Sequence, residues 1–340
     1  MMEKEKILEI LNEHYPVCFD SLEFVRDSGS MAYAVFSGRD KYFLRITKPA
    51  FFDTVHKSLE IHVFLMKQGF SVPPVIFTRD GSPRVHTSEE DGEHLYILYE
   101  FIEGKEVDPE QDAEAIGALL GKFHSAMKAY PGTLVKRDKY FYIGRYIDIL
   151  REKKYPRAEE FAAYGEALWE KIRGLPTGYC HGDMYRGNIH KAGDGRLYIL
   201  DFDTSCEGFP MYDPVLICNM TDYFEFQENG YEKSREVFAR FLPAYLKYSE
   251  LMPEEAAFYD LIALYHFALQ DTIVEVFGMD CVDDEFFDCQ LESCINGGSN
   301  VRNINGTDIK GNLRRKGRGS LLTARKLKRR GLLHVAALHR

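Results

Sequence analysis

The amino-acid sequence predicts an α+β protein made of two lobes, the first mostly sheet and the second mostly helix. The chain has 340 residues, which is enough to form two packed lobes. Before about residue 100, short runs rich in β-branched and aromatic residues alternate with polar turns such as DSGS and SGRD. From Pro109 onwards, apolar residues recur instead at helical spacing over longer segments.

The N-terminal lobe is expected to span residues 1–100. An amphipathic helix at 3–13 precedes three strand-like runs, CFDSLEFVRD, MAYAVFSG and KYFLRITKP, which should form an antiparallel meander. A second helix is predicted at 53–68, because its apolar side chains share one side and Gly69 ends it. Two more strands, RVHTSE and HLYILYEF, complete the lobe, and EFIEG contains the hinge, 101–104.

The C-terminal lobe is expected to span residues 105–296. One insert of two short strands around a turn, GYCHGDMYRGNIHKAGDGRLYILDFDT, interrupts its helices. The basic tail at 297–340 has no Phe, Tyr or Trp; we expect a disordered or non-native extension, the alternative being a basic arm for a membrane or nucleic acid. The helices are predicted at 110–130, 140–153, 158–173, 211–226, 231–248 and 254–277.

The net charge of −10 is unevenly distributed. Residues 300–340 contain twelve Lys or Arg and one Asp, a charge of +11, so residues 1–299 carry −21. An acidic body repels phosphate polymers, and nucleic acid is therefore not expected as a partner unless the basic tail is native. The same charge would attract a cationic substrate, although solubility explains it equally well.

The sequence contains no sign of a membrane partner or of export. No apolar run reaches the length of about 18 residues that a membrane-spanning helix needs. The N-terminal MMEKEKILEI lacks the apolar core of a signal peptide, and the seven cysteines are scattered without a CxxC pair. Scattered thiols are typical of reduced cytoplasmic proteins, and we therefore expect a cytoplasmic location.

The segment YCHGDMYRGNIH, followed by LDFD, gathers polar groups beside apolar runs. Asp183 and Asn188 stand five residues apart in a glycine-containing loop, and a short strand carries Asp201 back towards them. Asn188 and Asp201 offer one amide oxygen and one carboxylate, hard ligands that suit Mg²⁺ with water and phosphate oxygens as its other ligands. Asp183 is then left to accept a proton from a hydroxyl group and to aim that group at phosphorus.

These residues resemble the catalytic and metal segments of the aminoglycoside phosphotransferase and choline kinase superfamily. The interval from Asp183 to Asp201 is 18 residues, as expected in kinases. The resemblance covers about residues 20–290 and implies a bilobal protein-kinase-like fold. It also implies an ATP- and Mg²⁺-dependent phosphotransferase that phosphorylates a hydroxyl group of a small molecule, with Asp183 as the catalytic base.

The resemblance assigns nucleotide binding to two parts of the N-terminal lobe. SGSMAYAVF resembles the phosphate-positioning hairpin, so backbone N–H groups of Ser28, Gly29 and Ser30 should meet phosphate oxygens, although it has one glycine rather than three. FLRI places Arg45 where protein kinases use Lys, and its guanidinium should grip phosphate. Glu60, on the following helix, is its expected ion-pair partner; the alternative is that both are surface charges.

LYILYEFIEG resembles the passage from the last strand of the first lobe to the hinge. The adenine edge should bond to the backbone of Glu100, Phe101 and Ile102, so that their side chains matter little. Tyr99 falls where a bulky side chain narrows the base pocket. ATP is the expected phosphoryl donor, with GTP as the alternative.

Several other residues of the pattern have expected roles. His124, in IGALLGKFHSA, and Asp213, in GFPMYDPVL, should support the catalytic loop, and His181 should bond the backbone near the metal-binding Asp. Asp203 is assigned to a second metal ion or its water shell. Arg186 is expected to bring positive charge near the transferred phosphoryl group.

The acceptor should be a small molecule, because the APE motif and the activation segment of protein kinases are absent from the sequence. In the helix at 254–277, Tyr259, His266 and Asp271 combine an acid with aromatic rings, a suitable set for a cationic amine; the alternative is that this helix is simply core. Candidate acceptors are an aminoglycoside, choline or ethanolamine, homoserine, or a sugar. The alternative function is a catalytically silent nucleotide-binding interaction protein of the same fold.

Overall fold

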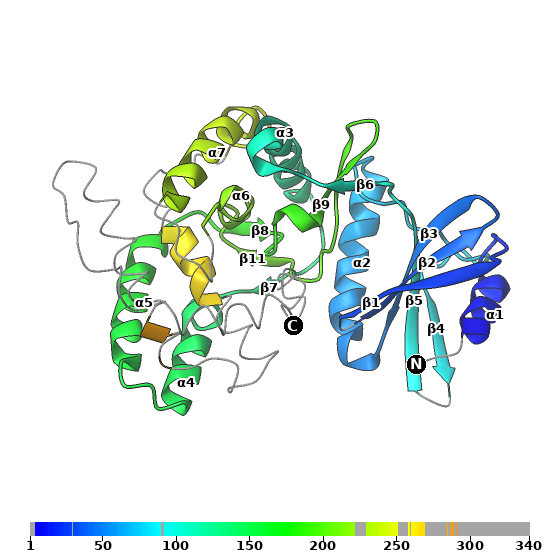
Figure 1. Cartoon of the computed structure of the whole chain (residues 1–340), viewed down its shortest axis with the longest axis horizontal. Coiled ribbons are helices and arrows are strands. Elements are labelled where there is room, and N and C mark those ends of the chain that lie inside the picture. The colour runs from blue at the N-terminus through cyan, green and yellow to red at the C-terminus, as the bar shows by residue number, and fades with distance from the viewer. Residues whose placement is uncertain are drawn as a thin grey trace.

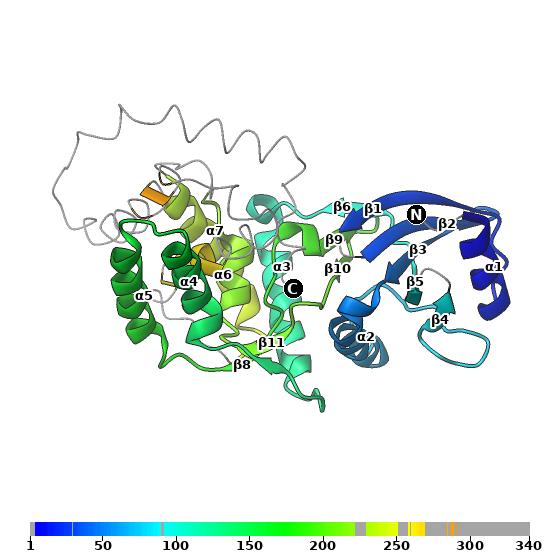
Figure 2. The same cartoon turned by 90° about the horizontal axis from the view of Figure 1, so that it is seen from below.

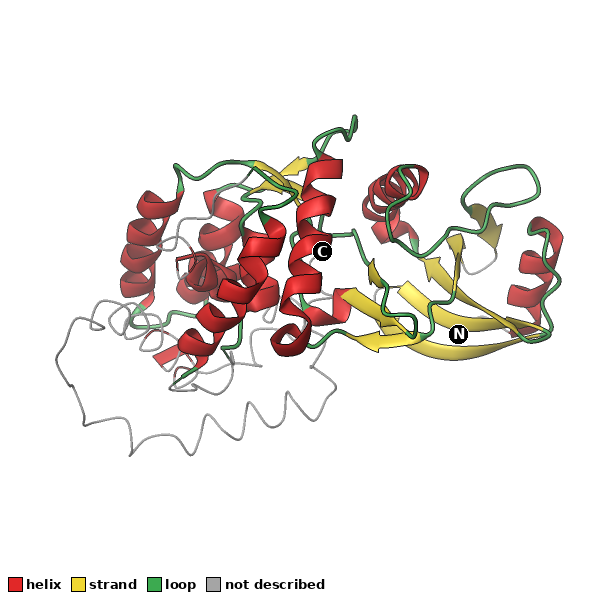
Figure 3. Ribbon diagram, turned by 90° about the horizontal axis from the view of Figure 1, so that it is seen from above, coloured by secondary structure: helices red, strands yellow, loops and turns green. Residues whose placement is uncertain are grey.

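The computed structural model has a sheet-based N-terminal lobe and a helical C-terminal lobe, joined through a short connection (Figure 1). Figure 3 shows the strands gathered in the first lobe and most helices in the second. The predicted α+β fold class is therefore confirmed. The structure describes residues 4–28, 30–89, 92–221, 229–250 and 260–268, together with residues 258, 284, 287, 288 and 291.

A five-stranded antiparallel sheet in the order β1-β2-β3-β5-β4 forms the N-terminal lobe. The first three strands follow one another as hairpins, as predicted, whereas β5 inserts between β3 and β4. Gly38 makes the turn between β2 and β3, where φ is +58°. The strands are β1 (Ser21–Ser28), β2 (Ser30–Ser37), β3 (Asp40–Thr47), β4 (Val85–Glu89) and β5 (Gly92–Glu100).

Two helices cover opposite faces of this sheet (Figure 1). Side chains alternate between the two faces along a strand. Leu95 of β5 therefore packs with α2 (Phe52–Lys67), whereas the next residue, Tyr96, packs with α1 (Lys4–His14). Both helices lie within one residue of their predicted positions.

Helix α2 also contacts the C-terminal lobe. Its Ile61 and Leu65 belong to the apolar core of that lobe. Phe202, from LDFD, lies edge-on to His62 of α2, with ring centroids 5.5 Å apart. The segment that carries the predicted metal ligands is therefore packed directly against a helix of the other lobe.

Most helices of the C-terminal lobe lie where the sequence predicts them. Its first helix begins at Pro109, after Asp108, whose carboxylate accepts the N–H of Glu110 at 3.0 Å. Helices α4 and α5 lie at the end of the molecule remote from the N-terminal lobe (Figure 2). The helices are α3 (Pro109–Met127), α4 (Arg145–Glu152), α5 (Ala158–Ile172), α6 (Tyr212–Cys218) and α7 (Gly230–Tyr245).

Two predicted helices differ from the structure. The helix expected at 140–153 begins as a π-helical turn, Tyr140–Gly144, before α4. The helix expected at 211–226 ends at Cys218. Residues 222–228, much of 254–277 and the tail 297–340 lie outside the described residues. Among those that are described, no helix is both long and apolar enough to cross a membrane.

The predicted insert, residues 178–204, contains three short strands rather than two, and a fourth follows directly after it. They form two small sheets, β10-β9-β6 and β7-β11-β8. Strands β6 and β7 were not predicted, because two or three residues show too little alternation to be recognised. The strands are β6 (Gly104–Glu106), β7 (Val135–Lys136), β8 (Gly178–Cys180), β9 (Ile189–Ala192), β10 (Leu197–Ile199) and β11 (Cys206–Gly208).

Helices α3 and α7 approach each other closely because glycines line the contact. A methyl group at Gly121 of α3 would collide with the backbone oxygen of Tyr245 on α7, and one at Gly117 would collide with that of Phe241. The backbones are therefore close enough that no larger side chain fits between them.

Gly121→Ala should force α3 and α7 apart and lower the free energy of unfolding by about 1–3 kcal/mol, the usual cost of overpacking. Urea unfolding would measure the loss. Gly174→Ala is the matched control, since a methyl group there meets nothing within 4 Å. Equal stability of the two variants would contradict this account of the helix contact.

Candidate active site

The loop after β8 brings Asp183 and Asn188 together. It ends in a single 3-10 turn, Arg186–Asn188, which leads into β9. The Nδ2 of Asn188 donates to the backbone oxygen of Asp183 at 2.8 Å and to its carboxylate Oδ2 at 3.0 Å. These two bonds fix the orientation of both side chains.

Asp201 reaches the same place by way of the β9–β10 hairpin. The N–H of Leu200 donates to the backbone oxygen of Asn188 at 2.9 Å, which ties the end of the hairpin to its beginning. Asp201 has a φ of +58°, a left-handed conformation that residues other than glycine rarely adopt. Strained conformations of this kind cluster at functional sites, where surrounding contacts impose them.

Negative charge is crowded at this centre. Burial raises the pKa of Asp183 well above its usual range, and the charge of Asp201 raises it further. Burial also raises the pKa of Asp201, with a contribution from Asp203. A cation beside Asp201 would relieve this repulsion.

The polar groups of this centre suit a magnesium ion that arrives with a phosphate ligand. Among the described residues, no group of three or more His, Cys, Asp or Glu side chains could enclose a metal. The nitrogen of Asn188 is used by Asp183, which leaves its Oδ1 for a cation near Asp201. Mg²⁺ commonly takes one or two protein ligands and completes its octahedron with water and phosphate oxygens.

Arg45 pairs with Asp203 and not with Glu60. Its Nη1 donates to Oδ1 of Asp203 at 3.0 Å, and its Nη2 donates to Oδ2. Glu60 is exposed, because Ser58 and His62 occupy the buried face of α2. The predicted Arg45–Glu60 ion pair is therefore wrong: the rotation of α2 against the sheet decides which of its residues can reach Arg45.

The same ion pair bears on the role predicted for Asp203. Both of its carboxylate oxygens accept from Arg45, so a metal ion would share them with the guanidinium; a role of Asp203 toward a second metal ion or its water shell stays a prediction. Burial opposes the charge of Asp203, yet Arg45 lowers the pKa of the carboxyl group. Asp203 thus occupies the place that the sequence analysis gave to an acid on α2.

The hairpin expected to hold phosphates is described only in part. Gly29 and the side chain of Ser28 lie outside the described residues. The Oγ of Ser30 accepts a hydrogen bond from Nε of Arg45 at 3.1 Å and lies 2.9 Å from Oγ1 of Thr47. Because that hydroxyl is used within the sheet, the backbone is the remaining candidate for phosphate at Ser30, and the role of the hairpin stays a prediction.

Arg26 lies near the acidic centre and was not selected from the sequence. A β-bulge between Phe24 and Arg26 shifts the register of β1 against β2 and redirects the side chains around it. Burial and Asp203 raise the pKa of Asp201, while Arg45 and Arg26 lower it. No motif marks Arg26, because an arginine in an edge strand is normally a surface charge.

Of the backbone N–H groups of Glu100, Phe101 and Ile102, one is left for a ligand. The N–H of Glu100 donates to the oxygen of Pro74 at 2.8 Å, and the N–H of Phe101 donates to that of Lys41 at 3.3 Å. Within the described part of the chain, the N–H of Ile102 has no such acceptor. Of the three predicted hinge residues, Ile102 is therefore the available donor.

Tyr99 lies between this connection and the acidic centre. Its ring centroid is 5.0 Å from that of His62 and 6.4 Å from that of Phe43. Burial raises the pKa of its phenol, and the charge of Arg45 acts in the opposite direction. The side chain is therefore close to Arg45, in keeping with its predicted position at the back of the base site.

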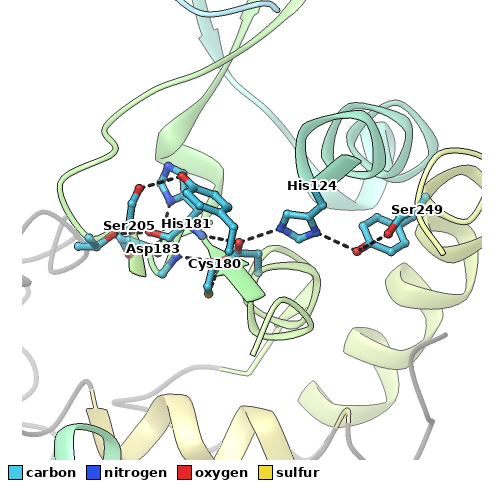
Figure 4. A network of polar contacts seen from close by, with 11 residues as sticks. His124, Cys180, His181, Asp183, Ser205 and Ser249 are labelled. Atoms are coloured by element: carbon cyan, nitrogen blue, oxygen red, sulfur yellow. Dashed lines mark hydrogen bonds and ion pairs between the residues drawn. The ribbon is translucent and has the colours of Figure 1, made fainter. Parts of the chain in front are cut away.

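Asp213 is the buried acceptor that shapes the loop carrying Asp183. Three of its partners, Cys180, His181 and His124, are labelled in the polar network of Figure 4. Its carboxylate accepts the N–H of His181 at 2.6 Å, the N–H of Gly182 at 2.9 Å and the thiol of Cys180 at 3.2 Å. Nε2 of His124 lies 3.0 Å from the same carboxylate. Burial opposes ionisation, but hydrogen bonding to His124 and the other donors lowers the pKa of Asp213. The structural roles predicted for His124 and Asp213 are confirmed.

His181 supports the loop and is not placed to take a substrate proton. Its Nε2 lies 3.0 Å from the backbone oxygen of Leu200, and its Nδ1 accepts the N–H of Asp183 at 3.4 Å. Burial lowers its pKa, so the ring is neutral near pH 7. This is the predicted role, since Leu200 directly precedes Asp201, the residue predicted to bind the metal ion.

Because Gly182 has no side chain, the guanidinium of Arg137 can lie against it, a contact that the sequence analysis did not predict. Its φ is +82°, and a methyl group there would lie 2.6 Å from the oxygen of Thr204 and 2.8 Å from Nη1 of Arg137. Arg137 thus lies against the residue that precedes Asp183. It stands 46 residues before Asp183 in the sequence, within no motif, and nothing local links the two.

Of the predicted substrate residues Tyr259, His266 and Asp271, only His266 is described, and the other two lie outside the described residues. His266 is buried, its Nε2 lies 3.2 Å from Oγ1 of Thr221, and burial lowers its pKa to about 4. Its neighbour Tyr265 is near the reaction centre instead, since burial and the charge of Asp183 raise the pKa of its phenol. A helix turns by about 100° per residue, so adjacent residues face different ways.

Arg186 is exposed and turns towards the strand that follows the hinge. Its Nε lies 3.4 Å from Oε2 of Glu106 on β6. A role for Arg186 beside the transferred phosphoryl group stays a prediction.

The fold and this constellation define a phosphotransferase. Residues 24–263 match the family model described as the Phosphotransferase enzyme family, and the chain belongs to that family. The chain is thus an enzyme, a small-molecule kinase, and the resemblance seen in the sequence is confirmed. An uncharacterized protein of Deinococcus radiodurans is 25% identical over 276 residues, which is 76% of each chain.

Similar solved structures support the same fold. Amicoumacin kinase hAmiN has a TM-score of 0.66 and 18% identity, with 88% of this chain and 94% of that chain covered. A microcompartment-associated aminopropanol kinase has a TM-score of 0.61 and 16% identity, covering 88% and 97%. Choline kinase LicA from Streptococcus pneumoniae has a TM-score of 0.57 and 16% identity, covering 87% and 98%.

Asp213→Asn should lower the free energy of unfolding by about 3 kcal/mol at pH 7, because it removes a buried charge that holds several donors. The pKa of Asp213 is lowered in the folded state, so its stabilising effect is present above the unfolded pKa and disappears as the pH falls through the folded pKa. Urea unfolding at pH 7 and in acid would test this. The exposed Asp148→Asn is the control, and a pH-independent gap between Asp213→Asn and wild type would contradict the account.

Asp183→Asn should raise the free energy of unfolding at pH 7, whereas Asp213→Asn should lower it. The pKa of Asp183 is raised in the folded state, so the ionised carboxylate costs stability, and this cost appears as the pH rises above the unfolded pKa. The gain in thermal midpoint should therefore be larger at pH 8 than at pH 5. A variant less stable than wild type at both values would rule out charge crowding at this centre.

Proposed function

We propose that this protein catalyses the ATP- and Mg²⁺-dependent transfer of a phosphoryl group to a hydroxyl group of a small molecule, with Asp183 as the catalytic base. The observation that carries the proposal is the placement of Asp183, Asn188 and Asp201 around one centre, with the Asn188 amide nitrogen held at 3.0 Å from the Asp183 carboxylate. Phosphoryl transfer needs little beyond an oriented nucleophile and neutralised charge.

Asp183 is suited to receive the proton of an acceptor hydroxyl. Its raised pKa makes the carboxylate a stronger base than an exposed Asp, and the bond from Asn188 leaves Oδ1 to the acceptor. Asn188 and Asp201 would hold Mg²⁺, which supplies neutralising charge to the nucleotide phosphates when bound. The nearby charges of Arg45 and Arg26 would add to that neutralisation.

The nucleotide would lie between the sheet and the acidic centre. The N–H of Ile102 would bond to the base, and Tyr99 would limit its depth; ATP is the proposed donor, with GTP as the alternative. Arg45, held by Asp203, and the backbone at Ser28–Ser30 would meet the phosphates. The similar structure of amicoumacin kinase is a complex with AMP-PNP and Ca²⁺, which supports a nucleotide and a divalent cation at this kind of site.

The acceptor is proposed to be a small hydroxylated molecule. The named relatives include kinases of amicoumacin, aminopropanol and choline, which differ widely in the size of the acceptor. An aminoglycoside, choline or ethanolamine, homoserine or a sugar remain candidates. The free thiols Cys18, Cys180, Cys206 and Cys218 support a reducing, cytoplasmic location.

A silent nucleotide-binding protein is the weaker alternative. Such a protein has no need to keep a strained Asp201 or a carboxylate as enclosed as Asp183. Both features lower the stability of the folded protein. Destabilising features of this kind are typical of sites that carry out a reaction.

Release of ADP with a panel of alcohols and aminoglycosides would identify an acceptor, and Asp183→Asn should then reduce kcat by about 100- to 10,000-fold, the usual contribution of a general base. Asp194→Asn, in the exposed β9–β10 turn, is the matched control and should retain full activity. Nucleotide binding without phosphorylation of any acceptor, or full turnover by Asp183→Asn, would favour the silent alternative.

A further inference from the structure

Arg137 lies beside the loop that carries Asp183, next to Gly182. Its backbone N–H continues the pairing of β7 with β11, donating to the oxygen of Glu207 at 3.0 Å. The side chain then runs to the catalytic loop, where Nη1 lies against Gly182. The guanidinium carbon is 4.2 Å from the centroid of the Phe141 ring, so the ring supports the cation from one side.

The guanidinium of Arg137 has no protein acceptor within the described part of the chain: no hydrogen bond from its side chain and no ion pair occurs there. A guanidinium carries five N–H donors, and a partly buried charge without a partner is costly. Arg45 is similarly enclosed but is gripped by Asp203, while the more exposed Arg157 pairs with Glu160. Arg137 is therefore available to an acceptor other than the described residues of this lobe.

The charge of Arg137 acts on a different set of groups from the charges of Arg45 and Arg26. Arg45 and Arg26 are the cations whose charges act on Asp201. Arg137 acts instead on Asp183 and on Tyr212, a neighbour of Tyr265. An acceptor whose hydroxyl meets Asp183 and whose body extends away from Asp201 would pass these groups.

The ring of Phe141 contacts a second guanidinium. The guanidinium of Arg145 lies 4.9 Å from the same Phe141 ring, so one ring carries a guanidinium contact from both Arg137 and Arg145. A planar, desolvated guanidinium beside an aromatic ring is well suited to a carboxylate or a phosphate, which it binds through two parallel hydrogen bonds.

We propose that Arg137, supported by Phe141, binds an oxyanion of the acceptor, so that the natural acceptor is an alcohol that also carries a carboxylate or a phosphate. The proposal rests on the proposed kinase function, because it assigns the acceptor class to the same site. The acidic body of the protein favours cations at long range, but contact with a partly buried guanidinium outweighs that effect at short range.

Binding of four related alcohols would test the site: glycerol, glycerate, glycerol phosphate and aminopropanediol, each with the protein saturated with AMP-PNP and Mg²⁺. They share a hydroxyl and differ in charge, and the thermal midpoint as a function of concentration reports their affinity. Glycerate or glycerol phosphate should bind best, and the preference between these two separates a carboxylate from a phosphate acceptor. Arg137→Gln should weaken that binding by about 10- to 100-fold, as expected for charge-assisted hydrogen bonds, with Arg137→Lys in between.

Lys136→Gln is the matched control, because Lys136 is the exposed neighbour of Arg137 and pairs with Glu207. It should bind the oxyanions as wild type does, and every variant should bind AMP-PNP unchanged, which verifies that it is folded. Equal oxyanion binding by Arg137→Gln and wild type would overturn the site. So would a preference of the wild-type protein for aminopropanediol, or no response to either oxyanion.

The outcomes separate this inference from the function on which it rests. If Arg137→Gln loses oxyanion binding but no alcohol is phosphorylated, the subsite stands and the kinase function fails. If an alcohol without an oxyanion is phosphorylated equally well by wild type and Arg137→Gln, the kinase function stands and the subsite fails. For an acceptor that carries an oxyanion, Arg137→Gln should raise its KM and leave the KM for ATP unchanged.

Discussion

The buried carboxylate of Asp213 is the interaction on which the catalytic loop depends. It binds two consecutive backbone N–H groups of the loop, at His181 and Gly182, and through His124 it is linked to α3 and to Tyr245 of α7 (Figure 4). A buried charge is tolerable only when several donors surround it, and here the donors come from parts of the chain distant in sequence. The loop is therefore held rigid, and the carboxylate that follows it projects from a fixed position.

A second charge pair connects the two lobes. Arg45 on the sheet binds Asp203, which stands two residues after Asp201, so the N-terminal lobe is tied directly to the segment of the proposed metal ligand. A bidentate guanidinium–carboxylate pair fixes both distance and orientation. The same arrangement explains why Glu60 is exposed: with Asp203 available, no acid on α2 is required to hold the arginine.

The buried carboxylates around the loop differ in their effect on the stability of the folded protein. Asp213 is ionised with ample hydrogen bonding, whereas Asp183 and Asp201 are crowded, and burial disfavours the charge on both. Arg137, whose charge acts on Asp183, is a cation without a hydrogen-bonded or ion-paired protein partner among the described residues. Buried charges of both signs that no protein counter-ion neutralises are thus concentrated around one loop. Such charges are typical of a site that binds charged ligands, whereas a purely structural site neutralises them.

The sequence by itself determined the order and period of the helices and strands, and the identity of Asp183, Asn188 and Asp201 as a unit, because these depend on spacing within a few turns of chain. Only the tertiary structure decided that Arg45 meets Asp203, that Tyr265 rather than His266 approaches Asp183, and that Arg137 lies against Gly182. Such contacts depend on how a helix is rotated against its neighbour and on how strands far apart in sequence pair. Adjacent residues on a helix differ by about 100° in direction, so a shift of one residue replaces a residue of the site with one of the core. The spacing of residues in the sequence does not determine that rotation.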